Sequence, residues 1–273
     1  EFKNVTVLSG RYGLGSKDTT PAQIVAVYNN KDKKRFTIGI NDDVTHLSLH
    51  EGPAIVTTPA GTVNCKFWGL GADGTVGANK NSIKIIGDNT DKYAQAYFDY
   101  DSKKSGGVTM SHLRFGDKPI KSTYLIKRAN FVACHNPAYM TKFNMVQELV
   151  DGGTFLLNCT WSKDEVEKHI PGQVKKYMAE HNIKFYIING VKIGIETGMG
   201  PTRINTILQS AFFTLTGIIP KEQANKLMKD AAQKTYGRKG EDVVKKNWAA
   251  IDAGANAFEE VEVKKEWANC ADE

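Results

Sequence analysis

Short apolar runs alternate with longer amphipathic stretches along most of this 273-residue chain. Runs rich in β-branched and aromatic residues and bounded by turn residues predict strands. They lie at residues 5–8, 36–40, 63–68, 93–100, 108–115, 130–134, 154–157 and 184–188. Apolar residues at three- and four-residue steps predict helices. These begin at Pro21 and also cover residues 75–86, 138–150 and the charged stretch 163–180.

The last third of the chain is predicted to be helical. Ile204, Ile207, Leu208 and Phe212 share one face, and the pattern recurs at residues 224–231 and 244–251. Such stripes are typical of buried core faces. Strands that alternate with helices indicate an α/β fold. We therefore expect a Rossmann-like, mostly parallel sheet with helices on both faces, followed by a helical C-terminal third.

The first 50 residues read as strand, glycine-rich loop, helix and strand, with Thr20 as N-cap and Pro21 at the first helical position. About forty residues cannot bury both faces of such a unit. We expect residues 1–50 to be a small α/β remnant of a preceding domain. Residues 51–62, which contain Pro59 and Gly61, are the predicted linker, and residues 63–273 form the main domain.

Composition narrows the class of protein. The chain is 41% hydrophobic and carries a formal net charge of +6, which is compatible with phosphate ligands but does not call for nucleic acid. No apolar run is long enough for a membrane span, and the first residues lack the apolar core of a signal peptide. The four cysteines are far apart, which is unlike a metal site. Three of them lie in or beside apolar runs, which favours reduced core cysteines in a cytoplasmic protein over disulfides.

A glycine motif follows the strand at 63–68. Residues 69–74 (GLGADG) fit G-x-G-x-x-G, and Thr75 opens the next predicted helix. In that context backbone N–H groups and the helix dipole face a phosphate. We predict that residues 69–74 form an anion- or nucleotide-binding loop. A tight strand-to-helix turn with a purely structural role is the alternative.

Cations from elsewhere in the chain strengthen the prediction. The strand at 93–100 is followed by a Ser/Gly loop that contains Lys103 and Lys104, which suits a ribose carrying an additional phosphate, as in NADP or coenzyme A. A solvated lysine pair in a turn is equally compatible. Arg203 is predicted in the first turn of a helix capped by Thr202, where a cation opposes the helix dipole and an anionic ligand or carboxylate would offset it.

Catalytic groups are poorly represented. His135 is expected at the end of a strand, where a hydrogen-bonded structural histidine is the simpler interpretation. There is no G-x-S-x-G, H-E-x-x-H or P-loop sequence, nor the Gly-Asp-Gly pattern that holds thiamine diphosphate through a metal. We therefore predict no catalytic residue and no metal ligand in this segment.

Longer strings of residues resemble pyruvate:ferredoxin (flavodoxin) oxidoreductases. They are SGRYGLGSK at 9–17, FTIGINDDVT at 36–45, GLGADGTVGANK at 69–80, FDYDSKKSGG at 98–107, FVACHN at 131–136 and KTYG at 234–237. The resemblance covers essentially the whole chain. It implies that residues 1–50 are the end of the family's transketolase C-like second domain and that residues 63–273 are its third, γ-type domain.

The resemblance also implies a function. The family's full enzyme is a homodimer that cleaves pyruvate with coenzyme A to acetyl-CoA and carbon dioxide and passes electrons to ferredoxin or flavodoxin. Thiamine diphosphate, Mg²⁺ and 4Fe-4S clusters belong to other domains of the same polypeptide. This domain is expected to help bind coenzyme A and to be inactive alone. The resemblance assigns several residues to that site, and it alone adds Asn247 on a late helix. The others are Gly71, Ala72, Asp73, Gly74, Thr75, Lys103 and Arg203.

Two other hypotheses remain open. In one, the chain is a non-catalytic interdomain scaffold whose glycine loop only packs tightly. In the other, it is an NADP-binding oxidoreductase domain that would turn over without other domains.

Overall fold

The computed structural model describes residues 3–12, 18–40, 43–71, 73–101 and 106–271. The chain divides into two compact units. One comprises residues 1–58 together with residues 121–127, and the other comprises residues 59–120 and 128–273. No helix in the described part of the chain has the length and apolarity needed to cross a membrane.

The first unit is a small α/β element. Strands β1 (Ser9–Arg11) and β2 (Arg35–Thr37) pair in parallel, and α1 (Pro21–Asn29) connects them. The predicted cap is confirmed, because Gln23 N donates to Thr20 Oγ1 while Thr20 N donates to the Gln23 side chain. The predicted strand at 5–8 is wrong: the strand begins at Ser9, and Val7 is 84% exposed.

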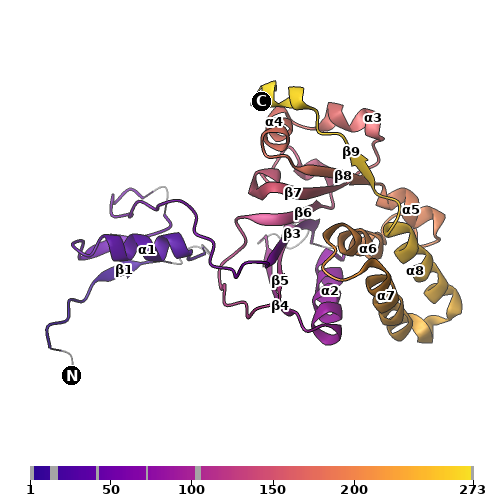
Figure 1. Cartoon of the computed structure of the whole chain (residues 1–273), viewed down its shortest axis with the longest axis horizontal. Coiled ribbons are helices and arrows are strands. Elements are labelled where there is room, and N and C mark those ends of the chain that lie inside the picture. The colour runs from indigo at the N-terminus through magenta and orange to yellow at the C-terminus, as the bar shows by residue number, and fades with distance from the viewer. Residues whose placement is uncertain (1–2, 13–17, 41–42, 72, 102–105, 272–273) are drawn as a thin grey trace. The chain divides into compact units, whose positions relative to one another are not determined.

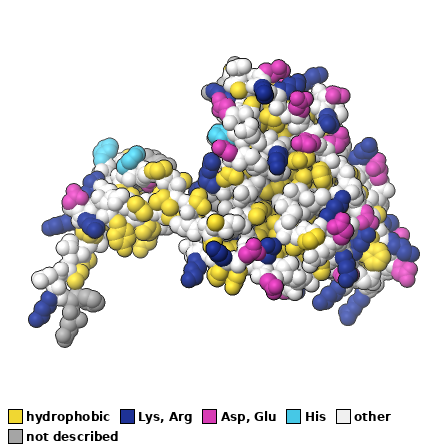
Figure 2. Space-filling view, in the orientation of Figure 1, with side chains coloured by type: hydrophobic (Ala, Val, Ile, Leu, Met, Phe, Trp, Pro, Cys, Tyr) yellow, Lys and Arg dark blue, Asp and Glu magenta, His cyan; other side chains and the backbone are white. Residues whose placement is uncertain are grey.

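The core of the first unit is small. It consists of Ala26, Phe36, Ile38 and Leu49. Residues 121–127 belong to this unit as well, and Leu125 N donates to Asp18 Oδ2 at 2.7 Å. Apolar side chains also remain on its surface, among them Ile24, Val25 and Tyr28 (Figure 2).

The second unit is built on one sheet. Within the described residues its strands lie in the order β4-β5-β3-β6-β7-β8-β9 (Figure 1). Their bounds are β3 Val63–Leu70, β4 Tyr93–Tyr100, β5 Val108–Gly116, β6 Ala129–Cys134, β7 Leu149–Asn158, β8 Lys184–Ile188 and β9 Glu259–Val261. Strands β3, β6, β7 and β8 are parallel. At one edge β5 pairs antiparallel with β3 and β4 pairs antiparallel with β5, and at the other edge β9 pairs antiparallel with β8. The predicted α/β class with a parallel centre is confirmed.

Helices flank this sheet (Figure 1). Their bounds are α2 Thr75–Asn89, α3 Lys163–Val166, α4 Gly172–Glu180, α5 Gly190–Glu196, α6 Asn205–Thr216, α7 Lys221–Tyr236 and α8 Glu241–Gly254. Short 3-10 turns add η2 Pro137–Tyr139, η3 Val146–Glu148, η4 Glu167–His169, η5 Gly237–Lys239 and η6 Lys265–Asn269. The helical C-terminal third is confirmed as α6, α7 and α8.

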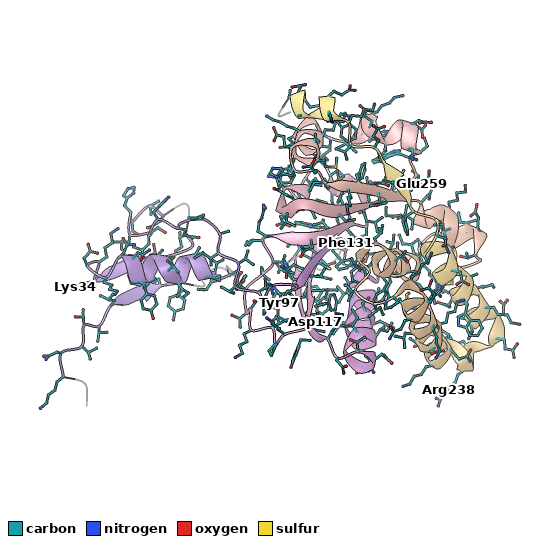
Figure 3. All side chains as sticks on the ribbon, in the orientation of Figure 1. Lys34, Tyr97, Asp117, Phe131, Arg238 and Glu259 are labelled. Carbon is teal, nitrogen blue, oxygen red and sulfur yellow. The ribbon has the colours of Figure 1, made fainter. Side chains whose placement is uncertain are left out.

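One aromatic residue organises the main core. Phe212 of α6 lies with its ring centroid 5.0 Å from Phe67 of β3 and 5.4 Å from Phe131 of β6, and both contacts are tilted or edge-on. Phe131 itself is 1% exposed and lies in the middle of the sheet (Figure 3). Burial of these rings fixes α6, and with it the segment that precedes α6, against the parallel strands.

Two predicted helices differ in the structure. In residues 138–150 the described helical segments are the short turns η2 and η3. Leu149 already pairs with Ala129 in the sheet, and the ring centroid of Phe143 lies 5.1 Å from that of Trp68. The stretch 163–180 is divided into α3, η4 and α4, since Pro171 immediately precedes α4. In both places the apolar residues are distributed over several short segments and do not form one face of a single helix.

Three of the four cysteines lie in the core, as predicted. All four cysteines lie in the described part of the chain and are free. Cys65, Cys134 and Cys159 are buried in or next to strands, and their burial raises the pKa of each thiol.

Candidate functional site

The loop between β3 and α2 is organised by Asp73. Its carboxylate accepts hydrogen bonds from Leu70 N and Thr75 N, both at 2.8 Å. Gly74 precedes the helix with a φ of +83°, a conformation that glycine adopts without strain. A Cβ at Gly74 would also collide with the amide of Asn205, whose Nδ2 donates to the Asp73 carbonyl oxygen. The acidic residue therefore stabilises the turn and the start of α2 itself.

A buried histidine lies beneath this loop. His135 Nδ1 is 2.7 Å from Thr75 Oγ1, and its backbone N–H donates to the Trp68 carbonyl oxygen at 2.9 Å. Burial lowers the pKa of His135 from 6.5 to about 4, although the nearby Asp73 charge acts in the opposite direction. The ring is therefore neutral at pH 7 and holds the loop in place, as the structural interpretation predicted.

Asn158 extends this arrangement along the carboxyl ends of the parallel strands. Its Nδ2 donates to the His135 carbonyl oxygen at 3.0 Å, and its Oδ1 accepts from Gly190 N at 3.0 Å. One buried amide thus connects the ends of β6 and β7 to the first residue of α5. The strand ends that carry the loops form a rigid hydrogen-bonded base.

A groove opens beside the start of α2. We name it the α2–α7 groove; its volume is about 790 Å³, within the range of about 300–1,000 Å³ of small-molecule and cofactor pockets. Its lining comes from the loop before α2, from α2, from the segment before α6 and the start of α6, and from α7, η5 and α8. The lining residues are Asp73, Gly74, Gly77, Ala78, Asn81, Met199, Thr202, Arg203, Asn205, Thr206, Met228, Ala231, Ala232, Thr235, Tyr236, Lys239, Val243 and Asn247. The lining includes small residues of both α2 and α7, and their short side chains leave space for a ligand between the two helices.

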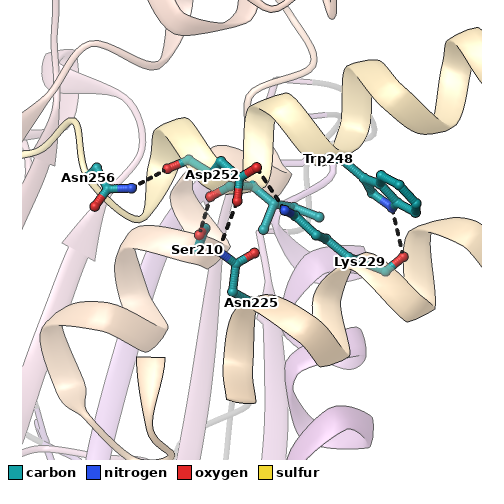
Figure 4. A network of polar contacts seen from close by, with 7 residues as sticks. Ser210, Asn225, Lys229, Trp248, Asp252 and Asn256 are labelled. Atoms are coloured by element: carbon teal, nitrogen blue, oxygen red, sulfur yellow. Dashed lines mark hydrogen bonds and ion pairs between the residues drawn. The ribbon is translucent and has the colours of Figure 1, made fainter. Parts of the chain in front are cut away.

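Polar contacts between helices hold the far wall in place (Figure 4). Asp252 of α8 accepts from Lys229 Nζ at 2.8 Å and from Asn225 Nδ2 at 2.9 Å, both on α7. Trp248 Nε1 of α8 donates to the Lys229 carbonyl oxygen at 3.1 Å, and Ser210 Oγ of α6 donates to the Ile251 carbonyl oxygen at 2.6 Å. Helices α6, α7 and α8 are therefore fixed as one body.

The structure brings several predicted site residues together. Asp73, Gly74, Arg203 and Asn247 all line the α2–α7 groove, although they come from distant parts of the chain. Gly71 and Thr75 belong to the same loop but lie outside the lining, and Thr75 is buried. Ala72 and Lys103 lie outside the described residues.

Two details differ from the sequence-based picture. Helix α6 begins at Asn205 with Ile204 as its N-cap, so Arg203 precedes the helix and Thr202 does not cap it. Within the described part of the chain Arg203 is exposed and has no ion-pair partner. In addition, the N–H groups of Leu70 and Thr75 already donate to Asp73.

Sequence reasoning missed Tyr236 and Lys239. Both line the groove, and Lys239 Nζ is 5.5 Å from the centroid of the Tyr236 ring. Tyr236 lies within the KTYG string, but no role followed from it. A sequence signal was present, because Gly237 and Gly240 bracket a short basic turn between two helices.

The fold and the groove define an α/β domain with a candidate ligand site among the helices beside its sheet. The pyruvate ferredoxin/flavodoxin oxidoreductase family model matches residues 64–257. The chain is 53% identical over 99% of its length to a pyruvate:ferredoxin oxidoreductase of Moorella thermoacetica, and 49% identical over 97% to a pyruvate-flavodoxin oxidoreductase of Enterobacter agglomerans. It spans 23% of the length of each of these relatives.

A solved structure supports the fold. A pyruvate oxidoreductase subunit from Thermotoga maritima matches 74% of this chain and 99% of its own chain, with a TM-score of 0.58 at 19% identity. At that identity the likeness concerns the fold alone. Together with the matched residues, the sequence identities establish that the chain belongs to the pyruvate ferredoxin/flavodoxin oxidoreductase family.

Proposed function

We propose that this chain is the coenzyme A-binding domain of a longer pyruvate:ferredoxin or pyruvate:flavodoxin oxidoreductase. The observation that carries the proposal is the α2–α7 groove, which gathers Gly74, Arg203 and Asn247 from three separate segments. The groove combines small residues that leave room for a ligand with polar groups that would orient it, as small-molecule sites do.

Each residue has a definite part in this proposal. Arg203 would donate two parallel hydrogen bonds from its planar guanidinium group to the oxygens of a phosphate. Asn247 is 3% exposed, and its Nδ2 donates to the Val243 carbonyl oxygen at 2.8 Å, so its side chain is held at a fixed position in the wall. Of the predicted loop 71–75, Asp73 and Gly74 would form the rim. Lys103, predicted as a further cation, keeps that role as a prediction.

The rest of the proposal concerns the longer protein. Residues 1–50 would be the end of the preceding domain, residues 51–62 a linker and residues 63–273 the γ-type domain. The full enzyme would be a cytoplasmic homodimer that oxidises pyruvate with coenzyme A and passes electrons to ferredoxin or flavodoxin. Thiamine diphosphate, Mg²⁺ and 4Fe-4S clusters would be held by other domains, so this segment alone would be inactive.

The proposal is tested in the full-length enzyme with Arg203→Gln. We expect the KM for coenzyme A to rise about tenfold, because one charge-assisted contact is lost, while the KM for pyruvate stays unchanged. Arg238→Gln is the matched control, because this substitution removes the same charge from an exposed residue that does not line the groove. An unchanged KM for coenzyme A in Arg203→Gln and in Asn247→Ala would reject the site.

The scaffold hypothesis has one observation in its favour. Asp73 already occupies the N–H groups of Leu70 and Thr75, so the loop is stable without a ligand. If the groove only joins helices, Asn247→Ala should lower the thermal unfolding midpoint and leave the KM for coenzyme A unchanged. The binding proposal predicts a raised KM at a temperature where the variant is fully folded.

A further inference from the structure

The charges that line the α2–α7 groove are unevenly distributed. Among the described lining residues, Asp73 is the one acidic side chain, and it lies at the start of α2. Arg203 precedes α6 and Lys239 ends η5, so the cations come from other walls. An anionic group in the groove is therefore attracted toward Arg203 and Lys239 and repelled from the rim at Asp73.

The position of Lys239 is set by its neighbours. Its Nζ lies 5.5 Å from the centroid of the Tyr236 ring, within the distance at which an aromatic face attracts an ammonium group. Gly240 follows with a φ of +105°, which turns the chain sharply into α8. The contact with Tyr236 thus favours one position of the Lys239 ammonium group.

The charge of Lys239 is also uncompensated. Lys245 and Lys246, which follow on α8, pair with Glu241 at 3.4 Å and Asp242 at 2.6 Å. Lys239 has no ion-pair partner among the described residues. Basic side chains gather at the outer ends of α7 and α8 (Figure 2), and of the described ones Lys239 lines the groove whereas Lys234 and Arg238 do not.

We propose that Lys239 is the specificity residue for a phosphomonoester on the ligand, which it binds together with Arg203, and that Tyr236 is the positioning residue for Lys239. This inference rests on the proposed function and adds the orientation of the ligand. The phosphomonoester lies at the Arg203–Lys239 side, and hydrogen-bond donors of the ligand lie toward Asp73. Removal of that phosphate removes the interaction, because a neutral hydroxyl gains little from two cations.

The experiment compares coenzyme A with dephospho-coenzyme A in the full-length enzyme. Wild type should bind coenzyme A about a hundredfold more tightly than dephospho-coenzyme A, because both cations contact the phosphate. Lys239→Gln should weaken coenzyme A binding about tenfold and leave dephospho-coenzyme A unchanged, so the preference falls to the share that Arg203 supplies, about tenfold. Lys239→Arg should retain the full preference. Arg238→Gln is the charge-matched control, and Figure 3 shows Arg238 at the outer end of the α7–α8 pair.

Tyr236 is tested by two substitutions. Tyr236→Phe keeps an aromatic face under the ammonium group and should keep the preference for coenzyme A. Tyr236→Leu keeps an apolar wall but removes the ring, and it should reduce the preference even where the unfolding midpoint is unchanged. Equal loss of preference in both variants would overturn the positioning role.

The outcomes separate the two proposals. If Lys239→Gln leaves the preference intact while Arg203→Gln raises the KM for coenzyme A, the inference is wrong and the binding site stands. If Lys239→Gln weakens both ligands equally, the lysine acts through general charge and the inference is also wrong. If Lys239→Gln, Arg203→Gln and Asn247→Ala all leave coenzyme A binding unchanged, the proposed function fails as well.

Discussion

At the carboxyl end of β3, one carboxylate takes the place that a phosphate would have in a simple glycine loop. Asp73 accepts from Leu70 N and Thr75 N, and these are donors that the G-x-G-x-x-G pattern predicts for a ligand. The pattern correctly located a strand-to-helix turn. Because the residue before Gly74 is an aspartate, two backbone N–H groups of the turn are hydrogen-bonded within the protein.

His135 makes the fold sensitive to acid. The pKa of the buried ring is about 4, whereas an unfolded chain binds the proton near 6.5. Between these values the unfolded state binds more protons than the folded state, so stability falls as the pH is lowered through this window. We expect the thermal unfolding midpoint to drop from pH 7 to pH 4.5, and to drop less in His135→Gln. The measurement is calorimetry or circular dichroism at both pH values.

His169→Gln serves as the control, because His169 is an exposed histidine. Between pH 7 and pH 4.5 its thermal unfolding midpoint should fall by as much as that of the unmodified chain. A pH dependence of His135→Gln equal to that of the unmodified chain would mean that other groups cause the acid sensitivity.

At the scale of elements, α2 presents two small residues, Gly77 and Ala78, to the groove. Gly77, Ala78 and Asn81 share the lining, and a Cβ at Gly77 would meet no atom within 4 Å. Gly87 lies further along the same helix, is exposed and is equally unobstructed, but it does not line the groove. The two glycines therefore form a matched pair.

Replacement of these glycines separates helix stability from binding. Gly77→Leu and Gly87→Leu should each raise the free energy of unfolding by about 0.5–1 kcal/mol, because glycine is a poor helix former. Only Gly77→Leu should raise the KM for coenzyme A, by at least about tenfold, because its side chain fills the groove. Urea unfolding and steady-state kinetics of the full-length enzyme measure the two effects. Equal KM values for both variants would place the ligand elsewhere.

Elements with their own local signals were predicted well. The strands at 93–100 and 184–188 match β4 and β8, and the Thr20–Pro21 start of α1 is confirmed. The predicted helix at 138–150 failed because its apolar residues serve different partners. The ring centroids of Tyr139 and Phe143 lie 5.5 Å apart, whereas Leu149 is part of the sheet. Local spacing cannot show which partner each side chain will meet.

At the scale of the molecule, the last residues hold the edge of the second unit. Strand β9 pairs with β8, and Trp267 of η6 is 2% exposed. Glu167 accepts from Trp267 Nε1 at 3.0 Å and from Lys264 Nζ at 2.6 Å. Residues 258–271 lie beyond the family match at 64–257, yet they are an integral part of this structure.

This C-terminal segment should contribute strongly to stability. Trp267→Ala is expected to lower the free energy of unfolding by about 3–5 kcal/mol, because it removes a large buried ring. Trp248→Ala should cost clearly less, since that indole is 36% exposed although it also donates one hydrogen bond. Urea unfolding followed by circular dichroism measures both. Equal losses would show that the buried contact of Trp267 adds little.

Sequence alone determined the α/β class, most strands and the residue types of the candidate site, because these depend on local periodicity and on motifs that are contiguous in the chain. Tertiary structure decided which of those residues meet. Asp73, Arg203 and Asn247 converge, and Tyr236 and Lys239 join them, only because Phe212 fixes α6 on the sheet and Asp252 fixes α7 against α8. Those contacts join residues far apart in sequence, so their effect on the groove arises from packing energies that no local pattern encodes.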